Sequence, residues 1–65
     1  MIIKLTDHAR QRMSEQAITL QMIEKAIKYG SKTKQTDGLR AAYMYYEVAY
    51  KRIGEIYVIK TVITK

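Results

Sequence analysis

The sequence predicts an α+β domain in which two N-terminal helices pack on one side of a three- to four-stranded antiparallel sheet, in the order β-α-α-β-β-β. Three observations support this prediction. Apolar residues recur with helical spacing before Gly30, and the pattern changes to a two-residue alternation after it. The C-terminal part is rich in tyrosine and in β-branched side chains, which favour strands. At 65 residues, the chain is expected to form one small domain, residues 1–65, with a marginal core.

The N-terminal segment is predicted to lead directly into a short helix. Ile2–Leu5 is apolar and is expected to be either an edge strand or an arm. Thr6 or Asp7 then offers an N-cap oxygen to a helix that should run from about His8 to Gln16. A helix of this length does not persist alone, so it must dock against the rest of the molecule.

The second helix is expected over residues 20–29, with Thr19 as its N-cap. Its buried stripe follows the spacing i, i+3, i+6, i+7 and consists of Leu20, Ile23, Ala26 and Ile27. Gly30 follows directly and is expected to adopt the left-handed conformation that ends many helices.

Strands are predicted for the remainder of the chain. Ser31–Thr36 is a loop or an edge strand, and Asp37-Gly38 is a strong hairpin-turn dipeptide. Leu39–Tyr50 is predicted to be one long strand. It is followed by the connection Lys51–Gly54, in which the glycine supplies positive φ, and by an antiparallel partner over Glu55–Thr64.

Strict alternation divides the last strand into two apolar faces. One face is predicted to hold Ile56, Val58, Lys60 and Val62, and the other Tyr57, Ile59, Thr61 and Ile63. One of these faces should meet the helices. The other is expected to meet a second subunit, because so short a chain without disulfides gains stability from a partner. We therefore expect a homo-oligomer, most simply a homodimer.

Composition narrows the classes of partner and of chemistry. Twelve Lys and Arg against six Asp and Glu give a net charge of +6, which favours anionic partners such as nucleic acid. The absence of cysteine excludes disulfides and Cys/His zinc sites, and no His/Asp/Glu pattern suggests another metal or a cofactor. No signal peptide or membrane span is apparent, so we expect a cytoplasmic, bacterial protein.

The only histidine lies four residues before an arginine, so the two side chains share one face of the first predicted helix. His8 is a candidate general base and Arg12 a candidate ligand for phosphate, which is the pairing that metal-free RNA cleavage requires. Two alternatives are open. His8 makes a structural hydrogen bond that locks the helix to the sheet, or Arg12 belongs to a solvated face and pairs with Asp7 or Glu15.

A second group of candidates suits nucleic-acid binding. Basic side chains surround a region whose only acid is Asp37, and a tyrosine on the adjacent strand offers a ring on which a base can stack. The candidate nucleic-acid-binding residues are Lys32, Lys34, Arg40 and Tyr46. The alternatives are an exposed loop made soluble by its lysines and tyrosines that pack in the core or at a dimer interface.

Two motifs resemble the domain-of-unknown-function 4258 family. The first is His8-Ala9-x-x-Arg12-Met13-x-Glu15, followed by Ile18-Thr19, a helix and Gly30. The second is the closing Tyr57-Val58-Ile59-Lys60-Thr61-Val62, which is similar to the final strand of that family. The resemblance spans residues 5 to 63. This chain has Gln16-Ala17 where the family often has Arg-Gly, so one basic residue and one turn glycine are missing.

That family is grouped with the RelE-like toxin superfamily, which includes many ribonucleases of toxin–antitoxin pairs. The resemblance implies a RelE-like fold and an RNA-cleaving or RNA-binding toxin relative, with His8, Arg12 and Thr61 as matched positions. It also implies RNA and a cognate antitoxin-like protein as partners.

Two functional hypotheses follow. The first is a metal-independent, cofactor-free ribonuclease-like toxin relative, in which His8 and Arg12 are exposed in one cleft beside basic residues. The second is a non-catalytic homodimeric module that binds a partner protein or nucleic acid, in which His8 is free to be buried.

Overall fold

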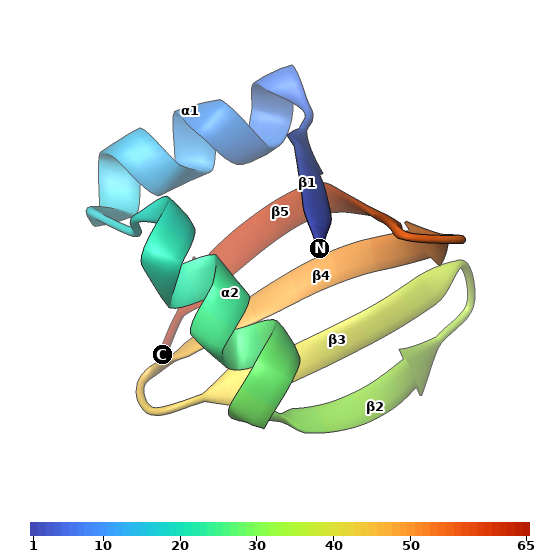
Figure 1. Cartoon of the computed structure of the whole chain (residues 1–65). Coiled ribbons are helices and arrows are strands. Elements are labelled where there is room, and N and C mark those ends of the chain that lie inside the picture. Colours follow the sequence, from blue (N-terminus) through green and yellow to red (C-terminus); the bar gives the residue numbers. More distant parts are fainter.

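Two helices cover one face of a five-stranded sheet (Figure 1) in the computed structural model, which describes all residues 1–65. The elements follow in the order β1 (Ile2–Leu5), α1 (Asp7–Gln16), α2 (Leu20–Tyr29), β2 (Ser31–Gln35), β3 (Gly38–Tyr43), β4 (Tyr46–Ile53) and β5 (Ile56–Thr64). Neither helix has the length and apolar character needed to cross a membrane.

The strands lie in the order β1-β5-β4-β3-β2, and β1 runs parallel to β5 while all other pairs are antiparallel. The predicted α+β class is therefore confirmed, but the three- to four-stranded antiparallel sheet is wrong in strand number and in direction. Two-residue turns force antiparallel pairing between consecutive strands. No such turn joins β1 to its neighbour β5, so β1 can pair with this last strand in the parallel direction.

Both helix starts are fixed by threonine caps, as predicted. The hydroxyl of Thr6 accepts a hydrogen bond from the Ala9 amide at 3.1 Å, and that of Thr19 accepts one from the Met22 amide at 3.2 Å. Each bond satisfies an amide that lacks a partner in the first helical turn. α1 ends at Ala17, which adopts the left-handed conformation with φ of 55°.

Gly30 ends α2, but the prediction of a left-handed conformation there is wrong. Its φ is −75° and its ψ is 166°, so the chain leaves the helix in an extended conformation and enters β2 at once. Glycine is required for space. A Cβ atom at this position would lie 2.6 Å from the carbonyl oxygens of both Ala26 and Ala42.

The predicted long strand over residues 39–50 is wrong, because the chain reverses at Met44 and Tyr45 and forms two strands. Tyr43 pairs with Tyr46 across this turn, and Met44 adopts a φ of 52°. No glycine, proline, asparagine or aspartate marks this turn in the sequence, so composition gave no signal for it. The turn at 36–37 lies at the predicted Asp37-Gly38 dipeptide. The predicted four-residue connection over Lys51–Gly54 is wrong, because β4 continues to Ile53 and the chain turns at 54–55.

The predicted alternation of the last strand fails at a β-bulge. Tyr50 pairs with Ile59 while the preceding Ala49 pairs with Thr61, so Lys60 is an extra residue in β5. Ile59 and Val62 are consequently both buried beneath the helices, although strict alternation assigns them to opposite faces.

The core lies between the helices and the sheet. It consists of eleven buried residues: Ala9, Ile18, Ile23, Ala26, Ile27, Ala41, Tyr46, Val48, Tyr50, Ile59 and Val62. Three of the four residues of the predicted α2 stripe belong to it. Leu20, the fourth, is 47 % exposed because it lies in the first turn of α2, at the margin of the contact with the sheet.

Side chains from both ends of α1 bind the outer edge of β5. The Thr6 hydroxyl donates to the Ile59 carbonyl at 2.9 Å. At the other end, the Gln16 side-chain amide donates to the Val62 carbonyl at 3.2 Å and accepts from the Thr64 amide at 2.6 Å. These bonds satisfy main-chain groups of β5 beyond the end of β1, where the strand would otherwise have an open edge.

Candidate nucleic-acid interface

The sheet has two faces, and the register assigns each basic residue to one of them. We call the face that α1 and α2 cover the helix-side face, and the opposite one the open face (Figure 1). On β2, Lys32 pairs with Ala41 and Lys34 with Leu39, so both lysines belong to the helix-side face. Arg40 lies one residue out of phase with them and belongs to the open face.

The cations around Glu47 on the open face are engaged in ion pairs. The Glu47 carboxylate lies 3.2 Å from the Arg40 guanidinium and 2.8 Å from the Lys65 ammonium. The hydrogen bond from Lys65 is the main reason that the pKa of Glu47 falls below its usual value, and Arg40 adds to it while burial opposes it. Arg40 is thus held in an ion pair, and its Nε is buried without a hydrogen-bond partner.

A second ion-pair group lies beside the turn between β2 and β3. Asp37 contacts the ammonium groups of Lys51 at 3.3 Å and Lys60 at 3.2 Å. Hydrogen bonds from Lys60 and then from Lys51 lower the pKa of Asp37. The cations of this group are therefore also paired within the protein.

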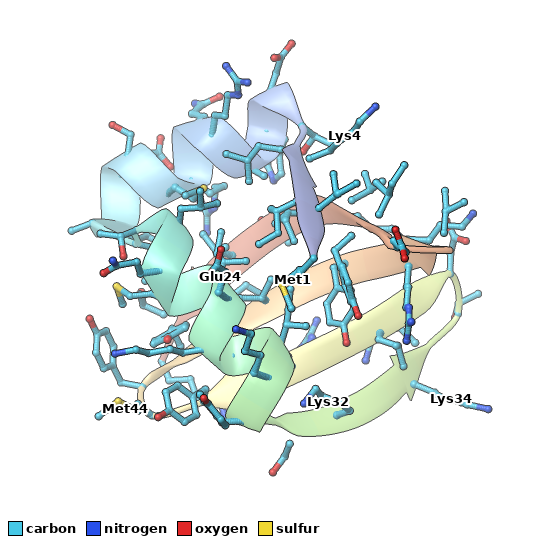
Figure 2. The ribbon with its side chains drawn as sticks, in the orientation of Figure 1. Met1, Lys4, Glu24, Lys32, Lys34 and Met44 are labelled. Carbon is cyan, nitrogen blue, oxygen red and sulfur yellow. The ribbon has the colours of Figure 1, made fainter.

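The helix-side lysines show the opposite pattern. The α2–β2 surface, as we name it, consists of five exposed residues: Lys25, Lys28, Tyr29, Lys32 and Lys34. None of its four lysines forms an ion pair. Figure 2 places Lys32 and Lys34 along β2 below α2.

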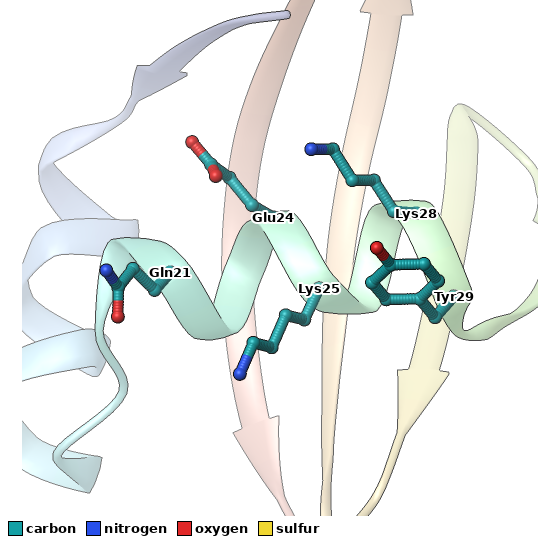
Figure 3. A pocket seen from close by; sticks show the side chains of 5 residues that line it. All are labelled: Gln21, Glu24, Lys25, Lys28 and Tyr29. Carbon is teal, nitrogen blue, oxygen red and sulfur yellow. The ribbon is translucent and has the colours of Figure 1, made fainter.

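Tyr29 is 69 % exposed, and the centre of its ring lies 6.4 Å from that of Tyr43. Figure 3 shows Tyr29, Lys25 and Lys28 around a shallow hollow on the outer side of α2, together with Gln21 and Glu24. Glu24 is the only acid there, and it forms no ion pair. The surface thus combines free positive charge with an accessible aromatic ring.

His8 and Arg12 lie at the other edge of the molecule, on α1. His8 is exposed and forms no hydrogen bond, so the structural bond considered for it is absent, and Thr6 and Gln16 hold α1 instead. The Arg12 guanidinium is 3.6 Å from Glu15, as in the solvated alternative. Neither residue lines a hollow of the structure.

The candidates predicted from sequence are therefore not brought together in one site. α1 packs on β5, which is three strands from β2, or about 14 Å at the usual strand spacing. Thr61 is half-buried on β5, paired with Ala49 on the open face. No three His, Cys, Asp or Glu side chains are grouped as metal ligands.

Tyr46 is a core residue. It is 2 % exposed, and its hydroxyl donates a hydrogen bond to the Met22 carbonyl at 2.7 Å. Burial raises the pKa of this hydroxyl, with smaller contributions from Tyr43 and Tyr45. Its ring is consequently inaccessible to a base. Of the four nucleic-acid-binding candidates, Lys32 and Lys34 are the pair that shares one exposed surface.

Sequence reasoning missed a second hollow at the end of the sheet where β4 turns into β5. Its lining residues are Met1, Arg52, Glu55 and Tyr57. The guanidinium carbon of Arg52 lies 5.4 Å from the centre of the Tyr57 ring, and its Nε donates to the Gly54 carbonyl at 2.9 Å. The residues come from separate segments, so only the β1–β5 and β4–β5 pairings bring them together.

The arrangement defines an α+β protein with two helices on one face of a five-stranded mixed sheet. The family model for a domain of unknown function, DUF4258, matches residues 5–64, and the chain belongs to this family, as its motifs predicted. The fold is similar to that of a chain in the RelBE2 toxin–antitoxin complex from Mycobacterium tuberculosis. The TM-score is 0.73 at 18 % identity, over 98 % of this chain and 96 % of that chain. No curated protein matches the sequence.

Proposed function

We propose that this protein binds RNA through the α2–β2 surface. The observation that carries the proposal is a series of four lysines without ion pairs along α2 and β2, with the exposed Tyr29 beside two of them, Lys25 and Lys28. The similarity to a chain of a toxin–antitoxin complex, together with the family's grouping with RelE-like proteins, adds support from fold.

Unpaired lysines are the cations best suited to phosphate. A lysine that meets a phosphate displaces a condensed counterion, and this release drives binding. Lys51 and Lys60 must first give up their ion pairs with Asp37, so they gain less from the same interaction. The difference favours the α2–β2 surface over the open face as the site of binding.

The exposed tyrosine favours single-stranded RNA over a duplex. Bases of a single strand are free to stack on an aromatic side chain, whereas bases in a duplex are stacked on one another. Tyr29 offers such a ring next to Lys25 and Lys28 (Figure 3).

Fluorescence anisotropy with a labelled single-stranded RNA, measured over a series of salt concentrations, tests this function. A Lys32→Ala, Lys34→Ala double variant should weaken binding and reduce the slope of log K against log salt by roughly 1.4, at about 0.7 for each phosphate of a single strand that is no longer neutralised. A Lys51→Ala, Lys60→Ala double variant removes the same charge from paired positions. If both double variants change the slope equally, net charge explains the binding and the proposed surface is wrong.

Ribonuclease activity is the second candidate function, with His8 as general base and Arg12 as phosphate ligand. The observation that favours it is the exposure of His8 with both ring nitrogens free of hydrogen bonds. Arg12 would have to leave Glu15 to reach a phosphate. Expression in a bacterial host, with growth and RNA integrity compared between the parent and His8→Ala, tests it. Intact RNA and equal growth in both strains would refute the enzyme.

A further inference from the structure

The hollow formed by Met1, Arg52, Glu55 and Tyr57 contains one cation and one anion that do not pair with each other. Neither Arg52 nor Glu55 forms an ion pair with any residue. The Nε of Arg52 is occupied by the Gly54 carbonyl, which leaves its two terminal NH2 groups free. A ligand of this hollow therefore meets a carboxylate that accepts hydrogen bonds and a planar group that stacks.

The side chains that line the hollow extend an aromatic stack. The rings of Tyr50 and Tyr57 lie 5.7 Å apart, and the Arg52 guanidinium lies over the Tyr57 ring. Tyr50 is 3 % exposed, so it supports the stack from within the core. Arginine planes and aromatic rings are the groups on which proteins stack unpaired bases. A flat aromatic ligand that entered the hollow would stack on the exposed Arg52 guanidinium, with the Tyr57 ring beneath it.

Glu55 decides which flat ligand fits best. A carboxylate repels phosphate, and it binds groups that present two adjacent N–H donors. Among the four RNA bases, guanine alone has two such donors on its Watson–Crick edge, at N1 and N2. Adenine presents an acceptor at N1, and cytosine and uracil present one donor group each next to acceptors.

We propose that this hollow binds a guanine base of the RNA, with Glu55 accepting the two hydrogen bonds and with Arg52 and Tyr57 providing the stack. The inference rests on the proposed function, because the same RNA must reach both sites. Tyr57 pairs with Ile3 and Arg52, which places the hollow on the helix-side face. The turn at 54–55 and the turn after Lys34 lie at the same end of the sheet (Figure 1).

Anisotropy with pentanucleotides that differ at one position tests the inference. In a uridine background, a central guanosine should bind about tenfold more tightly than a central adenosine, because guanine donates two hydrogen bonds to a charged acceptor. Inosine lacks the N2 amino group and should bind with intermediate affinity. Glu55→Gln should abolish the preference between guanosine and adenosine. Arg52→Ala should weaken all the pentanucleotides.

Asp7→Asn is the matched control, because it removes an exposed carboxylate that has no ion pair and lines neither hollow, so it should leave the preference unchanged. Circular dichroism establishes that each variant is folded. Binding that depends on Lys32 and Lys34 but shows no base preference would overturn this inference alone. Equal loss of preference in Asp7→Asn would also overturn it. Failure of every pentanucleotide to bind would overturn the proposed function with it.

Discussion

Ala17 is an L-residue held in the left-handed region, with φ of 55°, at the point where α1 ends. Its Cβ costs roughly 1–2 kcal/mol in that conformation, while glycine would add roughly 0.4–1 kcal/mol of chain entropy to the unfolded state. Ala17→Gly should therefore raise the free energy of unfolding by about 0.5–1 kcal/mol, as measured by urea denaturation.

Ala49→Gly is the control for this prediction. Ala49 lies within β4 and has no positive φ, so glycine there should lower the free energy of unfolding. If Ala17→Gly destabilises the protein as much as Ala49→Gly does, the backbone of Ala17 carries no strain.

Glu47 makes stability depend on pH, because Lys65 and Arg40 lower its pKa in the folded protein. The stabilisation that ionised Glu47 provides is complete above pH 4.5, the usual pKa of this group. It is lost as the pH falls through the lower pKa of Glu47 in the folded protein. Glu47→Gln should flatten the pH dependence of the unfolding free energy below pH 4.5, as followed by denaturant titrations at several pH values. Glu55→Gln, which removes a carboxylate without an ion pair, should retain the dependence of the parent. Equal slopes in all three proteins would contradict this account.

At the scale of elements, the attachment of α1 to β5 depends on a single amide side chain at its C-terminal end. Removal of the two Gln16 hydrogen bonds leaves the Val62 carbonyl and the Thr64 amide without these partners. Gln16→Ala should therefore lower the free energy of unfolding by about 1–3 kcal/mol and increase hydrogen exchange at the Thr64 amide. Gln11→Ala, on the exposed side of the same helix, should change neither measurement. Slow exchange at Thr64 in Gln16→Ala would refute this role.

The helices could be predicted from the sequence because their signals are local. Thr6 and Thr19 cap the helices within the same segments whose periodicity defines them. The sheet depends on signals that are not local. The turn at Met44 has no turn-forming residue, the extra residue at Lys60 is visible only against β4, and the parallel pairing of β1 joins the two ends of the chain.

The candidate site could likewise be predicted only where its signals are local. Helical spacing placed His8 and Arg12 on one helix, but it gave no information on their distance from the lysines of β2. Tyr46 packs in the core, as in the alternative stated for the tyrosines, because its face of β4 meets the helices. The hollow of Arg52 and Glu55 needs three strands in register, so no local pattern indicates it.

Over the whole molecule, charge is distributed unevenly between the two faces of the sheet. Asp37 and Glu47 form ion pairs with four cations on or beside the open face, while the lysines of the α2–β2 surface form none. The half-buried open face also carries Val58 and Ile63, and the homodimer expected from the sequence stays a prediction. Sedimentation equilibrium at micromolar concentration should give twice the chain mass if this prediction is correct. The monomer mass at all concentrations would refute it.

The additional residue in β5 is one that the strand can lose without exchanging its two faces. Before Lys60 the odd-numbered residues of β5 face the core, and after Lys60 the even-numbered residues face it. Deleting Lys60 would remove the bulge and restore strict alternation, in which Ile59 faces the core, Thr61 the open face and Val62 the core. In a sequence alignment, the two halves of this strand should therefore be placed separately, with a gap allowed between them.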